Sequence, residues 1–263
     1  MPDRTLAPFG RRLCPVVSHV AIGAYDVISL LDAEGPPPEP GQFYMLATSE
    51  RWGGGADERP FLPRAFSVLR RHEDGRLEFL FENVGPGTRR LCELRAGDGL
   101  WLLGPLGLGF RAPEDGRRPL LVGGGVGIAP LAIWQDEFVP THPDADVLLG
   151  FRDALHAEGA GLLRDARVAT DDGSVGHHGL VTELLREEVD ESCVVYACGP
   201  PPMLEAVRAL CASAEVPAQL ALESGMACGY GACFGCVVPT RTGYVRLCVD
   251  GPVLDAENLE LVA

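Results

Sequence analysis

Four cysteines near the end of the chain have the spacing needed to hold an iron–sulfur cluster. Cys228, Cys233 and Cys236 follow the pattern C-x4-C-x2-C, and eleven residues separate Cys236 from Cys248. This spacing is typical of the four thiolate ligands of a [2Fe-2S] cluster. Small residues around the ligands favour a compact loop that wraps such a cluster, namely Gly225, Gly229, Gly231 and Gly235.

Two other uses of these cysteines are weaker alternatives. A structural zinc site also takes four thiolates, but zinc ligands usually come as two short C-x2-4-C pairs. A disulfide framework fits less well still, because the chain has nine cysteines, an odd number, and its first residues do not read as an export signal. The spacing therefore favours an iron–sulfur cluster.

A second group of residues has the chemistry to clamp a flavin. Arg64, Phe66 and Ser67 lie within four positions and combine a guanidinium fork for phosphate, an aromatic face and a hydroxyl group. The plain alternative is a β-strand that places Phe66 in the core.

A glycine-rich turn supports the flavin interpretation. Gly87 and Thr88 precede a helix that we expect over residues 89–94. We expect Thr88 to be its N-cap, and the free amides of its first turn to suit a diphosphate.

Glycines also follow two apolar runs in the second half of the chain, at positions where a nucleotide can bind. Gly123, Gly125 and Gly127 come after an expected strand over 120–122, and they permit close approach of a dinucleotide diphosphate. Cys198 and Gly199 come after an expected strand over 194–197, at the strand end where α/β sheets bind ligands. A plain strand-to-helix turn and a buried, apolar Cys198 are the alternatives.

The elements that must position these residues divide the chain into three parts. Apolar runs of strand length, separated by Gly and Pro, predict an antiparallel β-barrel from strands over 15–22, 25–31, 42–48, 65–69, 77–84 and 100–103. From residue 119 onward, short apolar strands alternate with helical segments, which predicts a parallel sheet with helices on both faces. The fold class is therefore α+β and multidomain: a barrel over 1–115, an α/β domain over 116–220 and a small cluster lobe over 221–263.

Composition excludes several classes of function. The chain has 263 residues and a formal net charge of −15, and nucleic acid would repel that charge. No apolar run is long enough to cross a bilayer and no leader pattern is seen, so we expect a soluble, cytoplasmic protein without a membrane role. All 22 basic residues are Arg, which excludes Schiff-base and P-loop lysines.

Two loops carry side chains that invite a functional interpretation. Residues 52–60, with three consecutive glycines and several charges, are expected to form a surface loop. His177 and His178 lack Cys or carboxylate partners at ligand spacing, so we expect a solvated loop there as well.

The order of the motifs resembles that of ferredoxin-NADP reductase-like flavoproteins. The residues that carry the resemblance are the segments 64–67, 85–88, 123–127 and 198–200. The tail from Glu223 to Val253 is similar to the electron-transfer subunits of NAD-dependent dihydroorotate dehydrogenases, and the resemblance covers nearly the whole chain.

The resemblance implies FAD in the barrel, NAD in the second domain and a [2Fe-2S] cluster on the four cysteines. It implies that Arg64 holds flavin phosphate, that Phe66 stacks near the ring and that Ser67 hydrogen-bonds its edge. Gly87 and Thr88 would hold diphosphate. Phe66 departs from the tyrosine that many reductases carry, so a phenolic hydrogen bond is lost.

The same resemblance places residues of the second domain and the tail. Residues 125–130 and 198–200 would face the nicotinamide nucleotide, and Glu223 would lie near the flavin. Asp171 lies where NADP-specific enzymes have phosphate-binding residues, and its carboxylate favours NAD by repelling a 2′-phosphate. A solvated turn is the alternative for Asp171, and Arg152 is the residue that could reach the phosphate.

The implied function is electron transfer in pyrimidine biosynthesis. A catalytic subunit carrying FMN would oxidise dihydroorotate, and electrons would pass through the cluster and FAD to NAD+ in a hetero-oligomer. A flavin can link a hydride carrier to a one-electron cluster. The rival interpretations are a flavin and iron–sulfur module of a hydrogenase or ferredoxin:nicotinamide oxidoreductase, and, more distantly, a zinc-stabilised binding protein.

Overall fold

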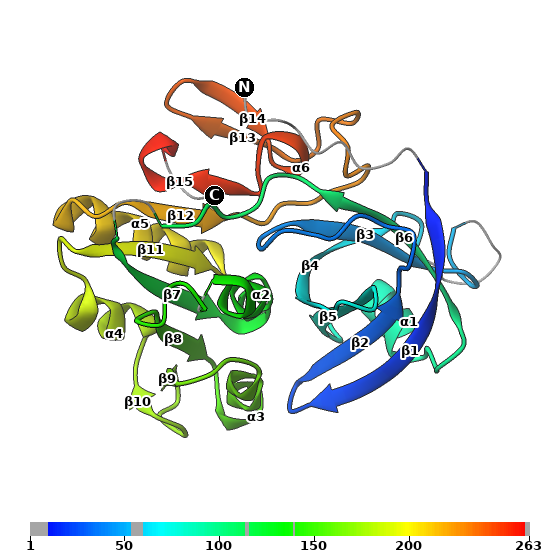
Figure 1. Cartoon of the computed structure of the whole chain (residues 1–263), viewed down its shortest axis with the longest axis horizontal. Helices are drawn as coiled ribbons and strands as arrows, with labels where there is room; N and C mark the ends of the chain where they lie inside the picture. Colours follow the sequence, from blue (N-terminus) through cyan, green and yellow to red (C-terminus); the bar gives the residue numbers. More distant parts are fainter. Residues whose placement is uncertain (1–9, 54–59, 114–115, 139, 261–263) are drawn as a thin grey trace.

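The structure consists of a barrel, a seven-stranded sheet and a small hairpin lobe (Figure 1). This computed structural model describes residues 10–53, 60–113, 116–138 and 140–260. Most of the expected loop over 52–60, and residues 114 and 115 at the expected domain boundary, lie outside the described residues. No helix in the described ranges is long and apolar enough to cross a membrane.

The first part is a closed antiparallel barrel, as predicted. Its strand order is β1-β2-β5-β4-β3-β6. The strands are β1 (Arg12–Ile22), β2 (Tyr25–Leu31), β3 (Phe43–Thr48), β4 (Arg64–Arg71), β5 (Arg76–Glu82) and β6 (Gly99–Leu106). Side chains such as Val16, Leu30, Phe79 and Leu102 fill one core. The helix α1 (Pro86–Cys92) follows β5.

The second part is a mainly parallel sheet in the order β10-β9-β8-β7-β11-β12-β15. Its strands are β7 (Arg118–Gly124), β8 (Asp146–Phe151), β9 (Ala166–Thr170), β10 (His177–His178), β11 (Cys193–Cys198), β12 (Ala218–Ala221) and β15 (Val253–Asp255). All neighbours are parallel except β12 and β15. The prediction of an α/β domain is therefore confirmed.

Helices cover both faces of this sheet. On one face lie α4 (Val181–Glu188) and α5 (Pro201–Ala214), packed in a core with Leu120 and Val122. On the other lie η1 (Gly125–Ile128), α2 (Ala129–Phe138), α3 (Ala154–Ala157) and η2 (Glu158–Leu162). The core of that second face also contains Leu69 and Leu80 of the barrel. The helix α2 thus lies between sheet and barrel and joins them through one apolar core (Figure 1).

The last part of the chain forms a small lobe that returns to the sheet. A hairpin of β13 (Val237–Thr240) and β14 (Gly243–Arg246) leads into α6 (Leu247–Asp250), then β15 and η3 (Ala256–Asn258). Because β15 pairs with β12, the lobe is hydrogen-bonded to the edge of the second domain. The domain bounds 1–115, 116–220 and 221–263 remain a proposal. The third of these segments is joined to the second, because its strand β15 pairs with β12.

Two local expectations differ from the structure. His177 and His178, expected in a loop, form the short edge strand β10, which pairs with Ala169 and Thr170. The helix expected over 89–94 begins at Pro86, so its N-cap is Gly85 and not Thr88.

Candidate cofactor-binding site

Two of the three predicted flavin residues of strand β4, Phe66 and Ser67, line a cavity between the barrel and the second domain, and the third, Arg64, does not line it. This cavity has a volume of about 260 Å³, and Phe66, Ser67 and Thr88 line it together with Val126 and Glu223. Residues of β4, α1, η1 and the tail therefore converge, although they are far apart in the sequence. An apolar cleft with a few polar groups at a domain interface is a typical cofactor site.

The position of Phe66 is compatible with both interpretations of its sequence context. Its ring centroid lies 5.8 Å from that of Phe81, so it packs on the barrel core. The same side chain is only partly buried and lines the cavity. A flat aromatic group in the cavity could therefore contact the free part of this ring.

Arg64 and Gly87 form a corner beside this cavity. A Cβ atom built on Gly87 would lie 2.9 Å from Nε of Arg64, so only glycine allows the guanidinium to lie against the start of α1. Arg64 donates a 2.6 Å hydrogen bond to the carbonyl of Leu62, and its guanidinium lies 5.9 Å from the ring of Trp52. A cation beside the free N–H groups of a helix start suits a phosphate.

Thr88 stabilises the turn before α1, which explains why the N-cap prediction is wrong. Its Oγ1 accepts hydrogen bonds from the N–H groups of Val84 (3.0 Å) and Gly85 (3.1 Å) and donates to the carbonyl of Gly85. The Thr88 hydroxyl, at the third residue of α1, therefore stabilises the turn formed by Val84 and Gly85. Its contact with the cavity remains, because Thr88 lines it.

A second and larger cavity, of about 700 Å³, lies at the carboxyl ends of β7, β8, β9 and β11. Gly125, Gly127, Asp171 and Gly199 line it, as expected for nucleotide-binding residues. This is the edge at which parallel sheets bind their ligands. Glu223 lines both cavities, so the two are contiguous.

Gly123 and Cys198 lie behind this cavity and do not line it. A Cβ atom on Gly123 would lie 3.0 Å from the side chains of Leu131 and Leu149, so this glycine allows close packing of α2 on the sheet. Cys198 is 1% exposed, and a Cβ on Gly127 would lie 2.4 Å from its carbonyl oxygen. Both residues shape the cavity through the backbone, and the small, buried Cys198 corresponds to the alternative interpretation.

Glu223 is an ionisable group that lines both cavities, as does Glu82. Its accessible surface opens into them, while the protein atoms around it raise the pKa of its carboxyl by desolvation. The same burial raises the pKa of the Cys198 thiol, with a smaller contribution from Glu223. Perturbed groups of this kind mark functional clefts.

An ion pair between the barrel and the second domain was not predicted from the sequence. Arg152 donates a 2.7 Å hydrogen bond to Oε1 of Glu82, and both residues line the larger cavity. Asp171 also lines it, whereas Asp172 accepts hydrogen bonds from the N–H and hydroxyl of Ser174, which lower the pKa of Asp172. Of the two neighbouring aspartates, only Asp171 lines the cavity.

The four predicted cluster ligands lie together in the C-terminal lobe. Cys233 is exposed, Cys228 is partly buried, and Cys236 and Cys248 are buried. Two of the sulfurs accept backbone hydrogen bonds: the N–H of Gly235 donates to Sγ of Cys233, and the N–H of Cys248 donates to Sγ of Cys236, both at 3.4 Å. No group of three or more metal-binding side chains in the described part of the chain could hold a single metal ion.

The four thiols fit the ligand set of a [2Fe-2S] cluster, whose sulfurs accept hydrogen bonds of the kind that Gly235 and Cys248 donate here. A zinc ion draws four thiolates around one point, whereas each iron of a [2Fe-2S] cluster takes two. Burial opposes ionisation of Cys228, but the N–H groups of Tyr230 and Cys233 outweigh it and lower the pKa of this thiol to about 7. Burial raises the pKa of Cys248 to about 12, helped by its neighbour Cys236.

The hairpin and a glycine, Gly229, bring the candidate ligands together. Leu247 donates a 3.1 Å hydrogen bond to the carbonyl of Cys236, so the last ligand follows directly beside the third. Gly229 has a φ of +80°, and a Cβ there would lie 2.5 Å from Cγ of Met45 in the barrel. The cluster loop therefore packs on the barrel, close to the smaller cavity.

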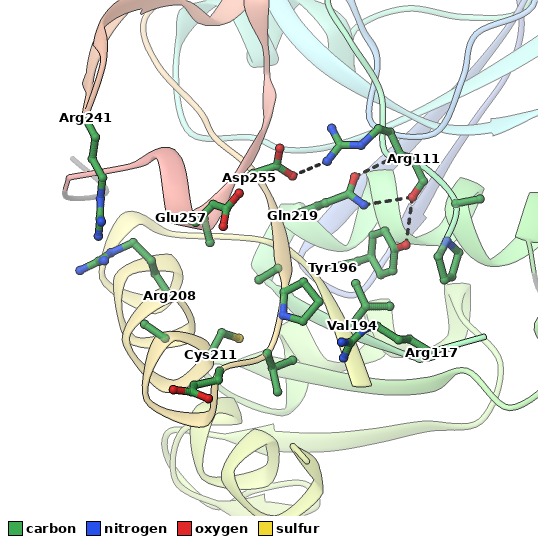
Figure 2. A pocket seen from close by; sticks show the side chains of 18 residues that line it. Arg111, Arg117, Val194, Tyr196, Arg208, Cys211, Gln219, Arg241, Asp255 and Glu257 are labelled. Carbon is green, nitrogen blue, oxygen red and sulfur yellow. Dashed lines mark hydrogen bonds and ion pairs between the residues drawn. The ribbon is translucent and has the colours of Figure 1, made fainter. Parts of the chain in front are cut away.

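A third cavity, of about 530 Å³, lies near β12 and α5, and none of the predicted site residues lines it. Figure 2 shows how Arg111 is held at its edge: Tyr196 and Gln219 donate to its carbonyl at 2.9 and 3.1 Å, and its side chain pairs with Asp255. These contacts bind the segment between barrel and sheet to both β12 and the lobe. We therefore interpret this region as a structural contact that holds the connecting segment, β12 and the lobe together.

The barrel and sheet define the class of ferredoxin-NADP reductase-like proteins. A solved NADH-dependent reduced ferredoxin-NADP oxidoreductase is similar with a TM-score of 0.78 and 25% identity, covering 97% of this chain and 92% of that one. A ferredoxin NADP+ reductase from Neisseria gonorrhoeae, solved with bound FAD and NADP, has a TM-score of 0.64 and 18% identity over 78% of this chain and 91% of that chain.

The particular family follows from closer relatives. Residues 223–260 match the iron-sulfur cluster binding domain of dihydroorotate dehydrogenase B. The dihydroorotate dehydrogenase B (NAD(+)) electron transfer subunit of Caldanaerobacter subterraneus subsp. tengcongensis is 40% identical over 231 residues, 86% of this chain and 89% of that protein. Its counterpart from Bacillus velezensis is 38% identical over 232 residues, 85% and 88% of the two chains. The chain belongs to the family of these electron transfer subunits.

Proposed function

We propose that this chain transfers electrons from a catalytic, FMN-containing dihydroorotate dehydrogenase subunit to NAD+. In this proposal FAD binds in the 260 Å³ cavity, NAD in the 700 Å³ cavity and a [2Fe-2S] cluster on the four cysteines. The observation that carries it is the continuity of the three sites. Glu223 joins the two cavities, and Met226, two positions before the ligand Cys228, lines the smaller one.

Each region of the chain then has a definite task. When bound, the flavin would exchange a hydride with nicotinamide and single electrons with the cluster. Arg64 and the start of α1 anchor the flavin phosphates, and Phe66 and Ser67 orient its ring. Residues 125–127 and 199 hold the nucleotide backbone, and Glu223 lies at the junction of the two cavities.

The partner subunit is proposed to dock where the cluster lobe is exposed. Cys233 is exposed, and Tyr230 and Phe234 beside it are each 63% exposed. Tyr244 at the tip of the hairpin is also exposed. Exposed aromatic side chains are enriched at protein interfaces, and a contact here would bring a second redox centre close to the cluster.

Reconstitution with the catalytic subunit tests this function. The isolated chain should reduce artificial acceptors with NADH but should not oxidise dihydroorotate. Adding the catalytic subunit should couple dihydroorotate oxidation to NAD+ reduction, and Phe234→Ala should weaken that coupling without changing the NADH activity of the chain alone. Dihydroorotate turnover by the isolated chain, or no coupling in the mixture, would contradict the proposal.

A further inference from the structure

Tyr25 carries a buried hydroxyl group that has no hydrogen-bond partner in the described part of the chain. The residue begins strand β2 of the barrel and is 1% exposed. Its ring is fixed on two sides. The ring of His156 meets it edge-on at a centroid distance of 5.7 Å, and a Cβ on Gly159 would lie 2.9 Å from Cε2.

Tyr25 lines the larger cavity, and its hydroxyl is directed toward Gly125, which lines the same cavity. The hydroxyl lies 4.0 Å from the Cβ position of Gly125, which has a φ of +56° and belongs to the glycine loop of the second domain. A barrel side chain therefore points across the domain interface to the loop that should hold the nucleotide backbone. The ribose and diphosphate of a dinucleotide carry the hydrogen-bond acceptors that such a loop binds.

Nearby groups leave the hydroxyl available to a ligand. Glu82 lies opposite Tyr25 in the β2–β5 register, but its Oε1 accepts a hydrogen bond from Arg152. His156 Nδ1 is 2.7 Å from Asp153, and its Nε2 lies near Arg152 and Glu82. Burial raises the pKa of Tyr25, with a smaller contribution from Glu82, so the phenol stays a donor. A buried donor without a partner is unfavourable unless a ligand satisfies it.

We propose that Tyr25 is a positioning residue for the nicotinamide nucleotide, whose ribose–diphosphate backbone accepts a hydrogen bond from its hydroxyl. This role rests on the proposed NAD site in the larger cavity. It assigns part of the nucleotide's affinity to the barrel, so that both domains hold the nucleotide.

Tyr44 provides a matched control within the same barrel. Its hydroxyl is also buried and without a hydrogen-bond partner in the described part of the chain, and the side chain is 0% exposed. Its ring packs edge-on against Phe79 at 5.5 Å, and it lines neither of the two candidate cofactor cavities. The substitution Tyr44→Phe therefore removes the same kind of buried hydroxyl as Tyr25→Phe, but outside the two candidate cofactor cavities.

The test compares Tyr25→Phe and Tyr44→Phe in protein loaded with flavin and iron. For Tyr25→Phe we expect the Kd for NAD+ and the KM for NADH to rise about 5- to 10-fold, with kcat within about twofold, because one hydrogen bond to the bound nucleotide is lost. The nucleotide-free thermal midpoint should stay equal or rise in both variants, since each loses an unsatisfied donor. Tyr44→Phe should bind NAD+ like the wild type.

Three outcomes would overturn the role of Tyr25. They are an unchanged Kd in Tyr25→Phe, an equal change in both variants, and a loss of affinity that parallels a loss of thermal stability. Failure of the wild-type protein to bind NAD+ at all would instead refute the proposed NAD site, and with it this role.

Discussion

Single side chains at the smaller cavity account for the expected affinity for flavin. Arg64 lies against Gly87 at the start of α1, and we propose that its guanidinium binds a flavin phosphate there. We expect Arg64→Ala to weaken flavin binding by about 1.5–3 kcal/mol, the usual value of a hydrogen bond to a charged group. Titration of the flavin-free protein measures this.

The control for this prediction is Arg76→Ala, which removes an arginine whose partner is the exposed Asp74 on the surface. It should leave the flavin Kd unchanged. If both variants bound flavin equally well, Arg64 would have no part in the site.

At this scale, the sequence predicted which residue types gather but not always where each side chain points. The four cysteines and Phe66 could be singled out as candidates because their chemistry is evident from type and spacing. Gly123 and Cys198 share a motif with cavity-lining neighbours, yet the alternating sides of a strand turn them away from the cavity. The role of Glu82 depends on contact with Arg152, 70 residues away, which no local pattern records.

Loops and turns determine whether the cluster ligands can meet. Gly229 adopts a left-handed conformation and lies against Met45, so any side chain there would both strain the backbone and clash. We expect Gly229→Ala to reduce iron content and to destabilise the lobe by about 1–3 kcal/mol.

Gly235→Ala is the matched change in the same loop. Gly235 has no positive φ, and its nearest neighbour would be Cys233 Sγ at 3.5 Å. This variant should keep its iron. Equal iron loss in both variants would show that the left-handed turn and the contact with Met45 are not what matters.

The choice between NADH and NADPH depends on the loops after β8 and β9. Asp171 would repel a 2′-phosphate, and Glu82 holds the Arg152 guanidinium that could otherwise attract one. Wild-type protein should prefer NADH, and the double variant Glu82→Gln with Asp171→Ser should raise kcat/KM for NADPH about tenfold, equivalent to about 1.4 kcal/mol.

Asp172→Asn keeps the turn acceptor and does not alter the cavity, so it should leave this preference as it is. Equal use of both nucleotides by the wild type, or no gain in the double variant, would remove Asp171 and Glu82 from cofactor selection.

The longer elements were predictable because apolar runs between Gly and Pro clusters mark them clearly. The barrel strands, β7 and β11 lie close to their expected positions. The strands β10, β12 and β15 have two to four residues, and their pairing depends on distant partners at the sheet edge. Such short strands carry too little periodicity to be recognised locally.

At the scale of the whole molecule, the three parts form one connected structure. The helix α2 shares a core with the barrel, and β15 extends the sheet of the second domain. Arg111, in the segment between barrel and sheet, is hydrogen-bonded to Gln219 of β12 (Figure 2). Domain order could be predicted from the sequence, but these interfaces could not, because they depend on how complete domains pack. They bring the two candidate cofactor cavities and the four cysteines of the lobe next to one another.

An anaerobic titration with NADH tests whether electrons pass from the nicotinamide through the flavin to the cluster. Protein purified from iron-replete cells should carry one FAD and about two irons per chain. NADH should bleach the flavin absorbance and produce the electron paramagnetic resonance signal of a reduced [2Fe-2S] cluster in the same sample. Zinc in place of iron, or a cluster that dithionite reduces but NADH does not, would contradict the account of a continuous path from nicotinamide to cluster.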